Sequence, residues 1–181
     1  TGVLRDLVRE VELSASDLVL PLFVQLGEER TPVEAMPGVE RMSISNAVAE
    51  AGAAYALGVP AVLLFGLPAE KDEQASGAYD DEGVVQLAVR AIKEAHPELV
   101  VITDVCLCGY TSHGHCGVVE GEAILNDVSL ELLARTAVSH AEAGADAVRA
   151  SHMLHGRDGV SPGALGAEGK GQLPGVSDSE R

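Results

Sequence analysis

Residues 99–117 read LVVITDVCLCGYTSHGHCG, a stretch that joins an apolar run to a cluster of cysteines. It opens with seven mostly apolar residues, the pattern of a strand buried in a parallel sheet. It then runs directly into the three cysteines of the chain, Cys106, Cys108 and Cys116. In parallel α/β proteins the loops at the carboxyl ends of the strands build the active site. The thiol side chains are therefore expected at a functional edge of the sheet.

The cysteines follow a C-x-C-x7-C spacing, which brings three thiolate donors within reach of one ion if the loop folds back on itself. Three glycines within or next to this loop, Gly109, Gly114 and Gly117, permit such a fold because glycine adopts positive φ angles. Three thiolates leave a fourth tetrahedral position, open in a catalytic zinc site and closed in a structural one. His115 is the candidate closing ligand. The spacing favours zinc of either kind, and three incidental thiols without a metal are the alternative.

Asp104 ends the strand and faces the same edge, so its carboxylate is a candidate for hydrogen bonding to a ligand or for proton transfer. The alternative role is structural, in which the carboxylate caps the following turn or supports the metal loop. His96, His113 and His140 have no partner at ligand spacing, and we expect them to be surface or capping residues.

The apolar strand pattern recurs on both sides of this stretch, at residues 18–24, 61–65 and 145–150. Apolar residues at helical spacing predict helices between these strands, from Ser43 or Ser45 to 57, over 84–95, and over 129–143. Pro21 is awkward in a central strand, so we expect either a bulge or a neighbour that does not need its N–H. The alternation of strands and helices is typical of parallel α/β proteins.

Composition divides the chain into three parts. Residues 1–17 are expected to form an N-terminal arm or helix, and residues 18–155 the α/β domain with the metal loop. Residues 156–181 contain seven glycines and two prolines but few large apolar residues, which predicts a flexible tail. The polar segment 69–82 is long for a loop in a compact domain, so it is either a lid or binding loop, or a solvated surface excursion.

The formal net charge is −16, from 28 acidic and 12 basic residues. Such a chain is a poor partner for nucleic acid or an anionic membrane, because phosphate binding needs clustered lysine and arginine. No apolar run reaches the roughly 18 to 20 residues of a membrane span. Three closely spaced cysteines also fit metal binding better than a disulfide framework. We therefore expect a cytoplasmic protein.

The motif at 104–117 closely resembles the metal-binding signature of the porphobilinogen synthase (5-aminolevulinate dehydratase) family in its zinc-dependent, cysteine-rich form. Further landmarks follow in family order over about residues 3–148: LPLFV at 20–24, MPGV at 36–39, LFG at 64–66, KDE at 71–73 and ND at 126–127. The resemblance implies a TIM (β/α)8 barrel, of which this chain holds about the first four βα units, and a homo-octamer. It also implies zinc on Cys106, Cys108 and Cys116 beside an active-site Asp104. The implied reaction condenses two 5-aminolevulinate molecules to porphobilinogen in tetrapyrrole (heme) biosynthesis.

Two parts of the family pattern do not match. Family enzymes form Schiff bases through two lysines in defined contexts, and Lys71, Lys93 and Lys170 match neither context. The likeness also ends after Val148. The chain is then a truncated or frame-disrupted family member, a shortened product that still binds zinc, or a half barrel completed by another chain. We expect this polypeptide to be inactive alone for lack of the lysines. The alternative is a non-catalytic zinc-binding or heteromeric regulatory module.

Overall fold

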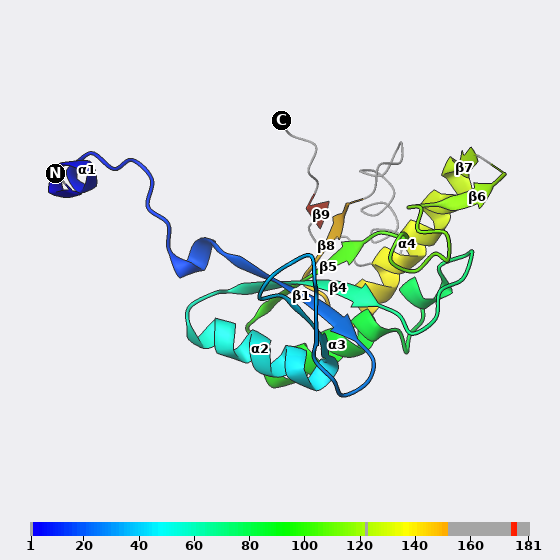
Figure 1. Cartoon of the computed structure of the whole chain (residues 1–181), viewed down its shortest axis with the longest axis horizontal. Helices are drawn as coiled ribbons and strands as arrows, with labels where there is room; N and C mark the ends of the chain where they lie inside the picture. Colours follow the sequence, from blue (N-terminus) through cyan, green and yellow to red (C-terminus); the bar gives the residue numbers. More distant parts are fainter. Residues whose placement is uncertain (1, 122, 152–174, 177–181) are drawn as a thin grey trace.

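The computed structural model describes residues 2–121, 123–151 and 175–176 (Figure 1). Its main sheet has the strand order β2-β3-β1-β4-β5-β8-β9. The strands are β1 (Val19–Gln25), β2 (Thr31–Pro32), β3 (Glu40–Ser43), β4 (Ala61–Leu67), β5 (Val100–Val105), β8 (Ala147–Ala150) and β9 (Gly175–Val176). Strands β1, β4, β5 and β8 are neighbours in chain order and pair in parallel. The predicted parallel α/β architecture is confirmed.

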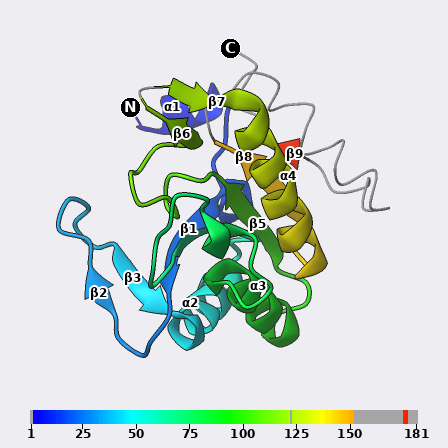
Figure 2. The ribbon, with the colours of Figure 1, turned by 90° about the vertical axis from the view of Figure 1, so that its right-hand side faces the viewer.

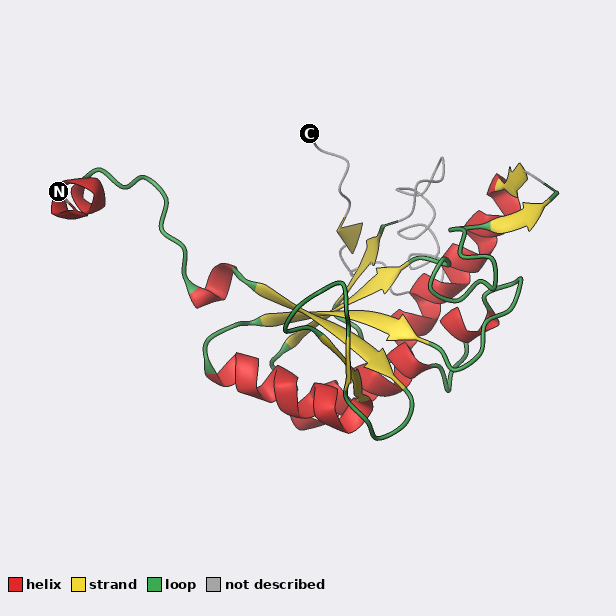
Figure 3. Ribbon diagram, viewed as in Figure 1, coloured by secondary structure: helices red, strands yellow, loops and turns green. Residues whose placement is uncertain are grey.

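Three helices lie on one face of this sheet: α2 (Ile44–Ala56), α3 (Val84–Ala95) and α4 (Asn126–Glu142) (Figures 2 and 3). Alternate strand residues such as Leu22, Val62 and Leu64 point into the helix layer and are fully buried. The residues between them point to the other face, where Phe23 and Phe65 are half-buried. Among the elements that the structure describes, no helix covers that second face. The core therefore lies between the sheet and the helices.

Local sequence signals explain where α2 begins and ends. The Ser43 hydroxyl accepts a hydrogen bond from the Asn46 N–H at 3.3 Å, so Ser43, rather than Ser45, is the N-cap. The helix ends before Gly58, which has a φ of 90°, a left-handed conformation that glycine adopts without strain. The predicted helix is confirmed within one residue.

Helix α4 begins three residues before the predicted start at Ser129. Ser129 is fully buried inside the first turn, where its hydroxyl accepts from the Val118 N–H at 2.9 Å and bonds to the Leu125 carbonyl. Its role is to tie the helix to the preceding hairpin.

Pro21 pairs with Leu63 of β4 in an unbroken register, so β1 has no bulge there. On the other side of β1, strand β3 pairs only with residues 23–25. Within the described residues no strand adjoins Pro21 on that side. The missing N–H of Pro21 therefore costs the sheet no hydrogen bond.

Short strands were missed. Residues 25–42, between the first predicted strand and the first predicted helix, contain β2 and the start of β3, and residues after the cysteines form a hairpin of β6 (Val118–Glu120) and β7 (Ala123–Leu125). Strands of two to four residues are too short to show a period-2 pattern in sequence.

The N-terminal part holds helix α1 (Gly2–Leu7) and a 3-10 turn (Ala15–Asp17), joined by a stretch that extends away from the sheet (Figure 1). Of the predicted tail at 156–181, only Gly175–Val176 is described; it pairs with β8 as β9. The rest of that tail and residues 152–155 lie outside the described residues. None of the described helices is long and apolar enough to cross a membrane.

Candidate metal centre

The three cysteines meet directly beyond the end of β5. The Cys106 sulfur lies 3.3 Å from the Cys108 sulfur and 3.5 Å from the Cys116 sulfur. All three Sγ atoms lie within 4.8 Å of one another, the only such group of potential metal ligands among the described residues. Cys106 is buried and the other two are half-buried. The loop 106–117, called the cysteine loop below, thus folds back on itself and forms a candidate metal site.

The three thiols differ in pKa because they form hydrogen bonds with one another and are buried to different degrees. The hydrogen bond from the Cys106 thiol lowers the pKa of Cys108 to about 6. The same bond, together with burial, raises the pKa of Cys106, and burial raises that of Cys116. One thiolate is therefore available near neutral pH, and a bound cation would supply the charge that favours ionisation of the other two.

Tyr110 anchors the cysteine loop to the protein core. Its side chain is 5% exposed and packs with Leu107, Ala75 and Ala78. Burial, with the nearby charge of Asp104, raises the pKa of Tyr110, so its hydroxyl stays protonated at neutral pH. The hydroxyl lies against the backbone of Gly66 in β4. This close approach requires a residue without a Cβ.

Gly66→Ala is accordingly expected to destabilise the fold by about 1 to 2 kcal/mol through overpacking. A Cβ at Gly66 would collide with the Tyr110 hydroxyl and lie 2.6 Å from a Val85 methyl group. Urea unfolding of the two proteins measures the difference. The matched control is Gly109→Ala, where a Cβ would meet its nearest atom at 3.5 Å. Equal losses in both variants would contradict the packing argument.

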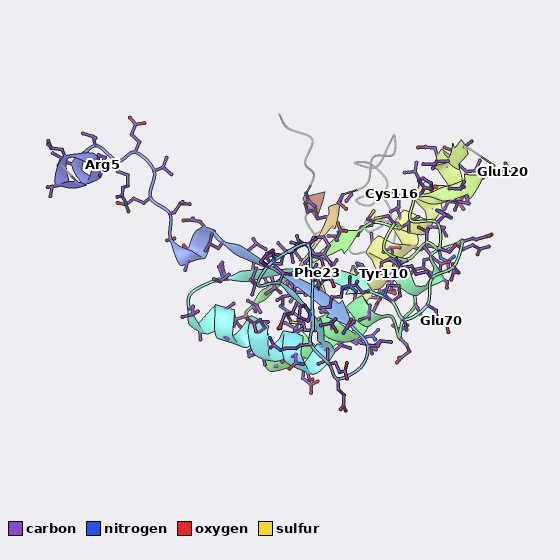
Figure 4. The ribbon with its side chains drawn as sticks, in the orientation of Figure 1. Arg5, Phe23, Glu70, Tyr110, Cys116 and Glu120 are labelled. Carbon is purple, nitrogen blue, oxygen red and sulfur yellow. The ribbon has the colours of Figure 1, made fainter. Side chains whose placement is uncertain are left out.

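A cavity of about 200 Å³ adjoins the sulfurs on the sheet face that carries no helix. Asp104, Phe23 and Phe65 line it together with Cys106 and Cys108. The two phenylalanine rings stack at 5.2 Å and form an apolar wall. Figure 4 labels Phe23, Tyr110 and Cys116, with Tyr110 and Cys116 on the arrowhead side of the sheet. Asp104 thus shares a cavity with two of the sulfurs, whereas the aromatic wall had not been predicted.

The histidines do not join the sulfurs. His115 is exposed, and its ring lies tilted against that of His113 with the centroids 5.4 Å apart, so the structure does not bring His115 into the ligand group. His113 is exposed and His96 caps the end of α3, as expected. The expectation for His140 was wrong, because this side chain is fully buried and bonds to the Thr103 hydroxyl at 3.0 Å. His140 lies on the apolar face of α4, three residues after the buried Ala137.

The described lysines also lie apart from the sulfurs. Lys93 sits at the amino-terminal ends of the strands, where its ammonium contacts the Asp146 carboxylate at 2.9 Å and the Leu99 carbonyl at 3.1 Å. Lys71 is exposed beside a second cavity, of about 270 Å³, formed mainly by the 69–82 segment. Lys170 lies outside the described residues. No described lysine therefore reaches the Asp104 cavity.

The segment 69–82 is packed against the cysteine loop. Asp72 forms a parallel β-bridge with Thr111, and Ala75 and Ala78 are fully buried beside Tyr110. A 3-10 turn (Ser76–Ala78) shapes its middle. The interpretation as a solvated surface excursion is therefore wrong at these positions. Sequence offered only a weak signal for this packing, two small apolar residues in a polar run.

The family model for delta-aminolevulinic acid dehydratase matches residues 1–177, so the expectation that the likeness ends after Val148 was wrong. Delta-aminolevulinic acid dehydratase of Halalkalibacterium halodurans is 48% identical over 178 residues, which cover 98% of this chain and 54% of that protein. The enzyme of the same name from Methanothermobacter thermautotrophicus is 53% identical over 157 residues, 85% of this chain and 48% of the relative.

A solved structure is also similar. The crystal structure of delta-aminolevulinic acid dehydratase from Toxoplasma gondii, in complex with the reaction product porphobilinogen, superimposes with a TM-score of 0.94 at 34% identity. The match covers 98% of this chain and 51% of that one. The chain thus spans about half the length of these relatives.

Proposed function

Because the chain belongs to the delta-aminolevulinic acid dehydratase family, we propose that it supplies the zinc-binding half of an active site that condenses two 5-aminolevulinate molecules to porphobilinogen. The observation that carries the proposal is the grouping of three cysteine sulfurs beside Asp104 at the carboxyl end of β5. A site at this end of parallel strands is where barrel enzymes place their chemistry.

The sulfur group fits zinc by its chemistry and its size. Thiolates are preferred zinc ligands, and tetrahedral zinc with Zn–S bonds of about 2.3 Å places its sulfurs about 3.8 Å apart. The sulfur–sulfur distances of 3.3 and 3.5 Å reach this value with small side-chain movements. Cys106, Cys108 and Cys116 would hold the ion. When bound, it would act as a Lewis acid that polarises a substrate oxygen.

Asp104 is the proposed catalytic residue of this half-site. Its carboxylate lines the cavity next to Cys106 and Cys108, within reach of a molecule bound there. A carboxylate in this position can accept a hydrogen bond from the amino group of 5-aminolevulinate or move a proton during condensation. The stacked Phe23 and Phe65 rings give the same cavity an apolar wall. We propose that these residues orient the substrate.

Within the part of the chain that the structure describes, no lysine lies near this cavity as a counterpart of the Schiff-base lysines that the resemblance implies. Lys93 is held by Asp146 at the opposite end of the strands. We therefore propose that the 181-residue polypeptide alone does not condense 5-aminolevulinate. Incubation with 5-aminolevulinate and sodium borohydride, followed by mass spectrometry, tests this directly. The expected result is no porphobilinogen and no reduced adduct, whereas an adduct on any lysine, Lys170 included, would overturn this part of the proposal.

A non-catalytic, heteromeric role is the second candidate. The half-buried Phe23 and Phe65 on the helix-free sheet face favour it, because a second polypeptide that completed the barrel would cover them. Size-exclusion chromatography with a full-length family enzyme tests this role, and co-elution supports it. We propose the homo-octamer that the resemblance implies only for the whole enzyme. Cytoplasmic residence also stays a proposal, which the three free thiols support.

A further inference from the structure

We propose that Thr111 and Asp72 are positioning residues for the metal site, with Thr111 fixing the Cys116 arm of the cysteine loop and Asp72 fixing Thr111. This inference rests on the proposed metal site. It adds two residues that do not bind the ion themselves but hold the cysteine loop in position. It concerns how tightly the site holds its ion.

The Thr111 side chain closes the loop that carries Cys116. Thr111 is 1% exposed, and its hydroxyl donates to the His115 carbonyl at 2.8 Å. That carbonyl belongs to the peptide group that links His115 to Cys116. Between these residues the chain turns through Gly114, whose N–H approaches the Thr111 carbonyl at 3.3 Å and whose φ is 76°. One side-chain bond thus fixes the peptide next to the third sulfur.

Asp72 holds Thr111 from outside the cysteine loop. The Asp72 N–H donates to the Tyr110 carbonyl at 3.3 Å, and the Ser112 N–H donates to the Asp72 carbonyl at 2.9 Å. These two bonds flank Thr111 and form the parallel bridge. Together with the buried Tyr110 ring they fix the backbone from which the Thr111 hydroxyl reaches His115.

The Asp72 side chain makes its own backbone rigid. Its carboxylate accepts from the Gln74 N–H at 2.7 Å, from the Ser76 N–H at 3.1 Å and from the Ser76 hydroxyl. These bonds, the one from the Ser76 hydroxyl first, lower the pKa of Asp72, so it is ionised at neutral pH. The turn at 72–76 is thereby closed on itself. Loss of the carboxylate would loosen the bridge without removing any group from the metal site.

The physical consequence concerns metal affinity. If the Thr111 hydroxyl is removed, the 113–116 segment gains conformational freedom that must be lost again when Cys116 binds the ion. Partners that orient metal ligands typically change affinity by about 10- to 100-fold. We expect Thr111→Val to weaken zinc binding by about that factor. Thr111→Ser keeps a hydroxyl and should stay within about threefold of the parent protein.

The experiment measures zinc affinity by competition with a chromogenic chelator, and the thiolate-to-cobalt absorption band after cobalt(II) substitution. The matched control is Thr136→Val, which removes another fully buried hydroxyl, bonded to the Leu132 carbonyl at 2.8 Å inside α4. It should lower stability and leave zinc affinity unchanged. A Thr111→Val protein that binds zinc as tightly as the parent would overturn the role of Thr111.

Asp72→Ala provides a second variant at an exposed position, in case Thr111→Val does not fold. We expect it to weaken zinc binding by about three- to tenfold. Parent-like affinity in Asp72→Ala would overturn the role of Asp72. If the parent protein itself binds no zinc, the proposed metal site fails; if the parent binds and all variants match it, only the positioning inference fails.

Discussion

Replacing Cys106 with serine is expected to lower the zinc affinity of the polypeptide by more than about a hundredfold. Loss of a residue that only orients a ligand lowers metal affinity by up to about a hundredfold, and loss of a ligand should cost more. Cys106 is the sulfur that contacts both others, at 3.3 and 3.5 Å. It is also the buried member of the group, so a serine hydroxyl there would neither ionise nor provide a soft donor. Two sulfurs then remain, too few for a closed thiolate site.

Chelator competition at one fixed pH measures this loss, because zinc binding to thiols releases protons and its affinity depends on pH. Thermal unfolding with excess EDTA serves as the control, and the parent and Cys106→Ser proteins should unfold alike under that condition. Zinc affinity within a factor of ten of the parent would show that the ion is held elsewhere.

The second large effect concerns stability in acid and comes from His140. Burial lowers the pKa of His140 from 6.5 to about 4. The ring is fully buried between α4 and β5, where its Nδ1 pairs with the Thr103 hydroxyl. Below pH 6.5 the unfolded chain binds a proton at this residue that the folded chain excludes. His140 therefore contributes full stability above pH 6.5, and that contribution is lost as the pH falls toward 4.

The complete loss amounts to about 3 kcal/mol, of which about 2 kcal/mol should appear between about pH 7.5 and about pH 5. Urea unfolding at the two pH values, with EDTA present so that zinc release does not contribute, measures it. His140→Gln keeps a polar group beside Thr103 but does not titrate. We expect its pH-dependent loss to be smaller than that of the parent by about 2 kcal/mol. Parallel pH profiles for the two proteins would contradict this assignment.

Much of the scaffold was predictable because its signals are local. The apolar runs at 18–24, 61–65 and 99–105 have strand length and lie between amphipathic helices, and each became a strand of the parallel sheet. The cysteine spacing likewise predicted the sulfur group, since only nine residues lie between Cys106 and Cys116 and glycine permits the turn between them. The strands and the sulfur group are set by residues close together in the sequence, so the sequence pattern predicts them.

Other features depend on contacts between segments that are far apart in the sequence. The bridge between Asp72 and Thr111 is made by main-chain groups, which every residue carries, so no side-chain pattern marks it. The stacking of Phe23 on Phe65 follows from the register of β1 on β4, which places these residues opposite each other. His140 differs from these cases. It lies three residues after Ala137, so the helical period places it on the apolar face of α4, and this period indicated its burial.

We propose that the three cysteines hold one zinc ion. The most direct test combines metal analysis of the purified polypeptide, loaded with zinc and dialysed, with X-ray absorption at the zinc edge. We expect one zinc per chain with three sulfur ligands at about 2.3 Å. A chain that retains no zinc, or zinc whose nearest neighbours are nitrogen and oxygen alone, would show that the three cysteines do not hold the ion.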